Sequence, residues 1–327
     1  MAICTNIIKE EESKMVIGID IGGMSIKYGL IENGKILFKN VIKFDKEISQ
    51  EKMIERLSKA IVESIAKWNV DIAQIKGIGV GCPGAIDSVN GICDKAYNLG
   101  FEKLNICKII TEITSLPCKI TNDANAAALA EAIYGSAKEY NNVIMLTLGT
   151  GVGGGIIIDK KLFEGNFGKG AELGHVVIKT DGEKCSCGRK GCLEAYASAS
   201  ALIKKTKKEM MKDKSTSMWS YVDNDINRVD GRTAFENAKL DDKCAKKVVR
   251  YYVKYLGEGL LNFMNIFRPD VIVLGGGLSS QKEYLNKQLY DYCAKRHFGF
   301  INCPQVGIVT ANLGNDAGII GAGCLML

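Results

Sequence analysis

One supersecondary pattern occurs twice in the sequence, and no other feature limits the possible folds as strongly. The first copy runs from Met15 to Phe38 and reads as an apolar strand, a glycine turn, a second strand, the tight turn ENGK and a third strand. The second copy runs from Val143 to Phe163, with the turn DKK before its last strand. Helical sequence follows each copy. Because the repeat is far longer than that of a solenoid, it predicts two related lobes.

The glycine-rich turns of the two copies suit phosphate binding. A glycine turn presents backbone N–H groups with no side chain in the way, and such groups cradle phosphate oxygens. A plain tight turn needs one or two glycines, whereas the stretch from Gly149 to Gly155 contains five. We therefore expect two hairpins that grip phosphates from both sides of a cleft.

Other nucleotide-binding patterns do not fit. G-x-G-x-x-G occurs at Gly79 and at Gly149, but a dinucleotide site needs a helix to begin at the last glycine. The residues after Gly84 resemble a turn, and those after Gly154 resemble a strand. The sequence contains no G-x-x-x-x-G-K-[ST], which excludes a P-loop enzyme. Only two histidines are present, which excludes most histidine-dependent mechanisms.

A short segment, AELGHVVIKTDGEKCSCGRKGCLE, predicts a metal site. It contains one histidine and three cysteines, and has a glutamate near its start and another at its end: His175, Cys185, Cys187, Cys192, Glu172 and Glu194. Three thiolates and an imidazole complete a closed tetrahedral zinc site. Free core cysteines are the alternative, but those are usually scattered, whereas metal ligands cluster. We expect structural zinc that orders this loop.

Asp123 follows an apolar, strand-like stretch and precedes an alanine-rich helix. A carboxylate at that position can cap the helix. It can also act as a general base that takes a proton from a substrate hydroxyl, provided that it points out of the helix. Asn122 beside it offers a donor and an acceptor to a neighbouring hydroxyl.

Composition describes a globular protein of ordinary size. The chain has 327 residues, 46% of them hydrophobic and 24% charged, with a formal net charge of +6. This mild, mixed charge predicts neither a nucleic-acid partner nor a membrane surface. The twelve cysteines, without a cleavable signal, predict reduced thiols and a cytoplasmic location. The first 14 residues read as a loose polar extension, too short for a DNA-binding module.

Taken together, the motifs resemble those of the ROK family, which contains bacterial sugar kinases and related repressors. The similarity runs from about Met15 to the C-terminus in the family's order. It is carried by DIGG at 20–23, GCPG at 81–84, NDANAA at 122–127, LGTGVGGG at 148–155, ELGH at 172–175 and the C-x-C-G-x-x-G-C-x-E stretch. The segment YNLGF at 97–101 is most like bacterial ROK glucokinases.

The resemblance implies an α/β, two-lobed actin-like ATPase fold, related to hexokinase and ribonuclease H, with a zinc-bound loop in the larger lobe. Residues 1–121 plus 312–327 would form the smaller lobe, which carries the first phosphate hairpin. Residues 122–311 would form the larger lobe, which carries the second hairpin, the zinc loop and the nucleoside site. The last helix, from Asn315 onward, would return to the smaller lobe.

The resemblance also implies roles for single residues. Asp123 would be the catalytic base in phosphoryl transfer from ATP·Mg²⁺ to a hexose. The sugar would be bound by Gly84, Asn122, Asp123, Glu172, His175 and Glu194, and structural zinc by His175, Cys185, Cys187 and Cys192. ATP would be bound by Asp20, Gly22, Gly23, Gly149, Thr150, Gly151, Gly153, Gly154, Gly155, Gly275, Gly276 and Gly277. The family commonly has Thr-Lys after its first glycines, where this chain has Met24 and Ser25, so a phosphate contact from Ser25 or Lys27 stays open.

The substrate is the least defined expectation. Glucose, converted to glucose 6-phosphate, is favoured, and the small Ala85 offers no side-chain donor to an N-acetyl group. N-acetylmannosamine is the runner-up, and fructose and allose follow. A sugar-sensing repressor is disfavoured by the short N-terminal extension, and a filament-forming actin relative does not require the zinc loop. Helices rich in lysine and methionine are compatible with a homodimer or homotetramer.

Overall fold

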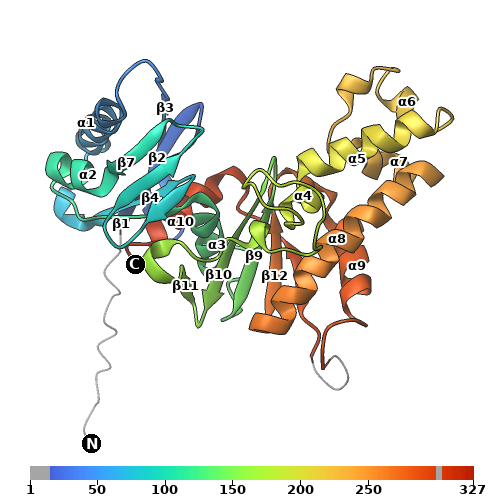
Figure 1. Ribbon diagram of the computed structural model, residues 1–327. Coiled ribbons are helices and arrows are strands. Elements are labelled where there is room, and N and C mark those ends of the chain that lie inside the picture. Colours follow the sequence, from blue (N-terminus) through green and yellow to red (C-terminus); the bar gives the residue numbers. More distant parts are fainter. Residues whose placement is uncertain (1–14, 300–303) are drawn as a thin grey trace, which may run out of the picture.

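The computed structural model describes residues 15–299 and 304–327, so the expected N-terminal extension lies outside the described residues. Two five-stranded mixed sheets stand apart in the molecule (Figure 1). The first sheet has the order β3-β2-β1-β4-β8 and the second sheet β11-β10-β9-β12-β13. The strands of the first sheet are β1 (Met15–Ile21), β2 (Ser25–Glu32), β3 (Lys35–Lys43), β4 (Ile75–Cys82) and β8 (Cys118–Asn122). Those of the second sheet are β9 (Val143–Leu148), β10 (Val152–Ile158), β11 (Lys161–Phe163), β12 (Val271–Gly275) and β13 (Gly307–Thr310).

The predicted duplication is confirmed and is longer than the sequence indicated. In each sheet three antiparallel strands are followed by two strands parallel to the first. Both meanders close with tight turns in the left-handed region, at Asn33-Gly34 and at Asp159-Lys160. Such turns match the natural twist of a hairpin. An α-helix precedes each parallel strand along the chain, and another follows the last strand of each sheet, so the two copies share strands and helices alike.

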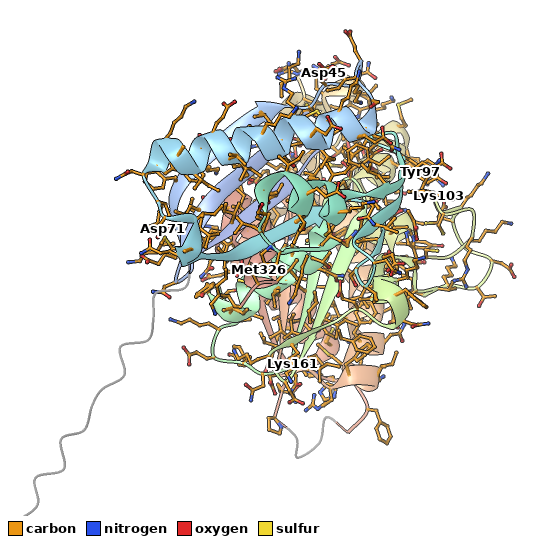
Figure 2. All side chains as sticks on the ribbon, turned by 90° about the vertical axis from the view of Figure 1, so that its left-hand side faces the viewer. Asp45, Asp71, Tyr97, Lys103, Lys161 and Met326 are labelled. Carbon is orange, nitrogen blue, oxygen red and sulfur yellow. The ribbon has the colours of Figure 1, made fainter. Side chains whose placement is uncertain are left out.

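Ten α-helices are present in the described part of the chain. They are α1 (Gln50–Trp68), α2 (Ile106–Thr114), α3 (Asp123–Ile133), α4 (Glu194–Ala197), α5 (Ala199–Lys212), α6 (Met218–Tyr221), α7 (Thr233–Lys239), α8 (Lys243–Phe267), α9 (Lys282–Cys293) and α10 (Ala317–Cys324). In Figure 2, α1 runs across the top of the molecule and Asp71 marks the turn beyond its end. The longest helix, α8, begins after Asp242, whose carboxylate accepts a hydrogen bond from the N–H of Ala245. No helix that the structure describes is both long and apolar enough to cross a membrane.

The sequence did not predict a third, small sheet. It consists of β5 (Ala85–Asp87), β6 (Ile92–Ala96) and β7 (Phe101–Asn105), paired in that order. Its strands are short, and the residues between them are typical of turns, so the segment reads as a loop in sequence alone. This small sheet follows Gly84 directly and therefore carries the chain from the end of β4 around the site.

Helices α3 and α10 lie between the two sheets and pack on each other (Figure 1). Glycines allow their backbones to touch neighbouring elements: a Cβ at Gly79 would lie 1.7 Å from the carbonyl oxygen of Ala322, and one at Gly321 would lie 1.7 Å from that of Ala126. A larger residue at position 79 would push α10 away from β4, and one at position 321 would push α10 away from α3. The spacing of the two sheets is therefore set by backbone contacts.

A buried glutamate fastens these helices. Glu131 on α3 has no exposed surface, and its carboxylate accepts four hydrogen bonds. Two come from the N–H and the hydroxyl of Ser136, and two from the N–H groups of Asn312 and Leu313, just before α10. The carboxylate thus links the end of α3 to the chain that leads into α10.

Candidate functional site

Asp20 is the next-to-last residue of β1, beside the first glycine turn. Its carboxylate lies 3.7 Å from the ammonium group of Lys27, and burial raises its pKa while Lys27 partly offsets that effect. A Cβ on Gly318 would lie 2.9 Å from the Asp20 carboxyl carbon, so Asp20 abuts the first turn of α10. The N–H of Gly22 donates to the carbonyl oxygen of Ser25 and closes the turn. Lys27 thus pairs with Asp20, and Ser25 shapes the turn through its backbone.

The second glycine turn is shorter than the sequence indicated. The tip is Gly149, Thr150 and Gly151, because β10 already begins at Val152. A Cβ on Gly154 would lie 2.7 Å from the side chain of Leu173, and one on Gly155 would lie 2.5 Å from the Cβ of Ala128. Close packing therefore accounts for the glycines at 154 and 155 without a phosphate.

Helix α5 fixes this tip from one side. The N–H of Ala199 donates to the carbonyl oxygen of Gly149 over 2.8 Å, and the Ser200 hydroxyl donates to that of Thr150 over 2.9 Å. A Cβ on Gly151 would lie 2.5 Å from Oε2 of Glu194, so only glycine leaves room for that carboxylate. The tip is therefore rigid and stands directly beside Glu194.

Asn122, and not Asp123, is the N-cap residue of α3. Its Oδ1 accepts from the N–H of Ala124 over 2.8 Å, while its Nδ2 donates to the carbonyl oxygen of Gly84 over 3.2 Å. The amide donor and acceptor of Asn122, which were expected to contact a substrate hydroxyl, thus make contacts within the protein. The cap leaves Asp123 as the first helical residue, with its carboxylate open to a cavity.

The pKa of Asp123 is raised, first because surrounding protein partly desolvates the carboxylate and then because Asp20 adds negative charge nearby. The side chain nevertheless keeps access to solvent through the cavity. One hydrogen bond, from the N–H of Ala124 over 2.9 Å, acts in the opposite direction. Partial desolvation with an open face is the environment that makes a carboxylate a stronger base.

Residues 172–194, here called the cysteine loop, bring three further predicted sugar ligands close to Asp123: Glu172, His175 and Glu194. Burial raises the pKa of Glu172; His175 offsets this in part, and the charges of Asp123 and Glu194 add to it. Glu194 accepts from the N–H of Val152 over 3.1 Å and from the Ser186 hydroxyl over 2.6 Å. Glu194 therefore joins the cysteine loop to the second glycine turn.

The four predicted metal ligands converge. Their ligand atoms all lie within 4.8 Å of one another, with 3.6 Å between His175 Nδ1 and Cys185 Sγ and 3.7 Å between the sulfurs of Cys187 and Cys192. A tetrahedral zinc with Zn–S bonds of about 2.3 Å would separate two sulfurs by about 3.8 Å. The donor set and its spacing therefore fit zinc. Other described cysteines are free thiols, mostly buried.

Three neighbouring cavities surround the second glycine turn. The largest, about 790 Å³, is lined by Gly84, Tyr97, Asn98, Thr150, Gly151, His175 and Glu194 among others. A second, about 330 Å³, is lined by Asp123, Gly149, Gly151, Gly153, Glu194 and Gly276 among others. A third, about 370 Å³, is lined by Gly149, Thr150, Gly277, Asp230, Arg232 and Gln281 among others. None of these three cavities is lined by the predicted site residues Asp20, Gly22, Gly23, Asn122, Gly154, Gly155, Glu172, Cys192 and Gly275.

Sequence reasoning missed Asp230, Arg232 and Gln281. Asp230 accepts hydrogen bonds from the backbone N–H and the guanidinium of Arg232, which holds that side chain at the third cavity. No motif marks these residues, because the fold brings them together from segments far apart in sequence. The predicted ATP-binding residues Gly149, Thr150 and Gly277 were the sequence signals for this cavity.

Residues 16–327 match the ROK family. A glucokinase of Halalkalibacterium halodurans is 33% identical over 317 residues, which are 95% of this chain and 94% of the relative. A ROK family glucokinase from Streptomyces griseus, solved with glucose and AMPPNP, is 31% identical and superposes with a TM-score of 0.76 over 95% of this chain and 98% of that one. A xylose repressor of Caldicellulosiruptor bescii is 32% identical over 288 residues, 86% of this chain and 71% of the repressor.

Proposed function

This chain belongs to the ROK family and is an ATP-dependent sugar kinase, and from that premise we propose that it converts glucose to glucose 6-phosphate with Asp123 as the general base. One observation carries the proposal. Because Asn122 caps α3, the Asp123 carboxylate is open to a cavity that is also lined by Glu194 and the second glycine turn. Glucokinases among the relatives, one with glucose bound, favour glucose as the acceptor.

In the proposed reaction, Asp123 takes the proton from the hydroxyl on carbon 6 as that oxygen attacks the γ-phosphorus, and ADP leaves. Such transition states need mainly positioning and charge stabilisation. Backbone N–H groups of Gly23, Thr150 and Gly151 would hold phosphate oxygens, with Mg²⁺ offsetting their charge. Gly22 and Gly149 would shape the two turns, because their N–H groups donate to the carbonyl oxygens of Ser25 and Gly151. Gly153, Gly154 and Gly155 would contribute by letting β10 pack tightly behind the tip.

The sugar would be held by paired hydrogen bonds, because an unpaired polar group in a closed site costs roughly 1–3 kcal/mol. Glu172 and Glu194 would accept from sugar hydroxyls, and Gly84 would let the ring approach the backbone. Asn122 would act by fixing Gly84 to α3, in keeping with its contacts. Gly275, Gly276 and Gly277 would face the nucleoside; Gly277 already lines the third cavity.

Zinc would be held by His175, Cys185, Cys187 and Cys192 and would order the loop that carries the sugar ligands. His175 uses Nδ1 toward Cys185, which leaves Nε2 for a sugar hydroxyl. With four protein ligands the metal has no open position, so its contribution is structural. The Ser186 hydroxyl, between two zinc ligands, already donates to Glu194 and so links loop order to sugar binding.

We also propose the lobe boundaries at 121/122 and 311/312, with α3 and α10 between the lobes. Closure of the lobes would exclude water and limit ATP hydrolysis. Free thiols support a cytoplasmic location, and the lysine- and methionine-rich helices of the larger lobe support a homodimer or homotetramer. N-acetylmannosamine is the runner-up substrate, followed by fructose and allose.

Replacing Asp123 by asparagine tests the proposal. The variant should bind glucose as the parent does, because the amide keeps the shape of the carboxylate, while kcat falls on the order of 10²–10⁴-fold. A coupled assay of ADP release, run with a panel of hexoses and without sugar, measures both substrate choice and turnover. Near-full turnover of the variant would remove Asp123 from the mechanism, and a clear preference for another hexose would replace glucose.

The similarity to a xylose repressor favours a sugar-sensing role as the second candidate. Sugar-dependent ADP release separates the two, because a sensor needs only to bind its sugar.

A further inference from the structure

Residues 164–171, here called the clasp, connect the end of β11 to Glu172 and contact the small sheet and β8. We propose that Lys169 in the clasp is a positioning residue for sugar binding, because its ion pair with Asp94 on β6 fixes the chain that carries Glu172. The inference rests on the proposed role of Glu172 as a sugar ligand.

The clasp leaves the second sheet and is attached to elements outside it. Lys169 Nζ lies 2.6 Å from Asp94 Oδ2 in the small sheet. The hydroxyl of Thr121, a buried residue of β8 in the first sheet, donates to Glu164 Oε1 over 2.5 Å. Gly168 packs so closely on Ser88 that a Cβ would lie 2.4 Å from the Ser88 hydroxyl oxygen. Three independent contacts, with Asp94, Thr121 and Ser88, therefore hold the clasp to elements outside the second sheet.

The backbone of the clasp is strongly bent. The N–H of Gly170 donates to the carbonyl oxygen of Glu164 over 2.6 Å and closes the loop. Phe167 and Ala171 have φ values of 55° and 62°, in the left-handed region. A residue with a side chain adopts that region only at an energetic cost, so the surrounding contacts must impose it. Ala171 immediately precedes Glu172, and the contacts that hold Ala171 therefore also direct Glu172.

On its other side, Glu172 is anchored to the second sheet. Leu173 is 4% exposed and lies against Gly154 of β10. Gly174 lies against the backbone of Val152, where a Cβ would be 2.0 Å from the carbonyl oxygen. The chain around Glu172 is thus held on one side by the Lys169–Asp94 ion pair and on the other side by packing on β10. Loss of either contact would let the Glu172 carboxylate leave the position in which it contacts a sugar hydroxyl.

Among the contacts that hold the chain around Glu172, the Lys169–Asp94 ion pair is the easiest to test by substitution. Its side chains are 50% and 35% exposed, so salt screens the interaction and substitution should not unfold the protein. Asp87 adds further negative charge near Lys169. An effect on sugar binding that depends on salt would distinguish the ion pair from general packing.

The experiment compares Lys169→Met, Asp94→Asn and the double variant with Lys161→Met, which removes an exposed lysine from β11 (Figure 2). We expect each clasp variant to raise the KM and the Kd for glucose about 2–5-fold, with the double variant no worse than Lys169→Met alone. The kcat, the KM for ATP and the melting temperature should stay near those of the parent. Added NaCl should raise the parent's KM for glucose and leave that of Lys169→Met nearly unchanged.

An unchanged or lower KM for glucose in Lys169→Met would overturn the inference, as would an equal effect in Lys161→Met. A parallel loss of melting temperature and of ATP affinity would also overturn it, because it would show a general structural role. If the panel of hexoses identifies another substrate, the same comparison is made with that sugar. Failure of glucose as substrate therefore counts against the proposed function and leaves the test of Lys169 intact.

Discussion

Replacing Glu131 by alanine tests whether one buried carboxylate fastens the two helices between the sheets. The change leaves four donors without their acceptor: three backbone N–H groups and the Ser136 hydroxyl. An unsatisfied buried donor costs roughly 1–3 kcal/mol, but Asn312 is exposed and water can reach its N–H. Counting two of the four as unsatisfied, we expect the free energy of unfolding to fall by about 2–6 kcal/mol.

Thermal and urea denaturation measure this loss. The melting temperature should fall by at least about 3 °C. Glu131→Gln keeps the shape and one acceptor oxygen but turns an NH₂ group toward donors, so its effect should lie between parent and alanine variant. Glu139→Gln, at an exposed position, is the matched control and should change stability by less than about 0.5 kcal/mol. A Glu131→Ala protein as stable as the control would refute the reasoning.

Two further predictions concern the site. Removal of the metal by a chelator should raise the KM for sugar and lower the melting temperature, with both restored by Zn²⁺; unchanged affinity and stability would contradict a structural metal. A base works only when deprotonated, and the pKa of Asp123 is raised above the usual 3.8, so kcat/KM should decline on the acid side with a midpoint above 3.8. A midpoint at or below that value, in pH profiles of the parent enzyme, would contradict the desolvated environment.

Patterns of closely spaced residues were predicted well from the sequence. The paired meanders follow from alternating apolar strands and glycine turns, and the metal cluster follows from four ligand residues in one short segment. The choice between capping and catalysis at Asp123 could not be made from sequence. Asn122 and Asp123 are adjacent and both cap helices well, and only the backbone geometry shows that Asn122 takes the cap.

What the sequence could not predict depends on contacts between distant segments. The small sheet is built from strands of three to five residues that only tertiary packing can stabilise. Arg232 and Gln281 line one cavity with Gly149 only because the start of α5, the residues just before α7 and the segment after β12 come together around that cavity. The glycines at 154 and 155 read as phosphate ligands in sequence, because the side chains of Leu173 and Ala128 that press on them are remote.

The matching strand order of the two sheets has an evolutionary consequence. In the first copy the chain passes from Lys43 at the end of β3 to Gln50 at the start of α1; in the second it passes from Phe163 at the end of β11 to Lys243 at the start of α8. The clasp, the cysteine loop and α4–α7 all occupy that one enlarged connection. Three of the expected sugar ligands, Glu172, His175 and Glu194, therefore come from one connection of the second copy, so evolution can alter them together while the duplicated strands stay intact.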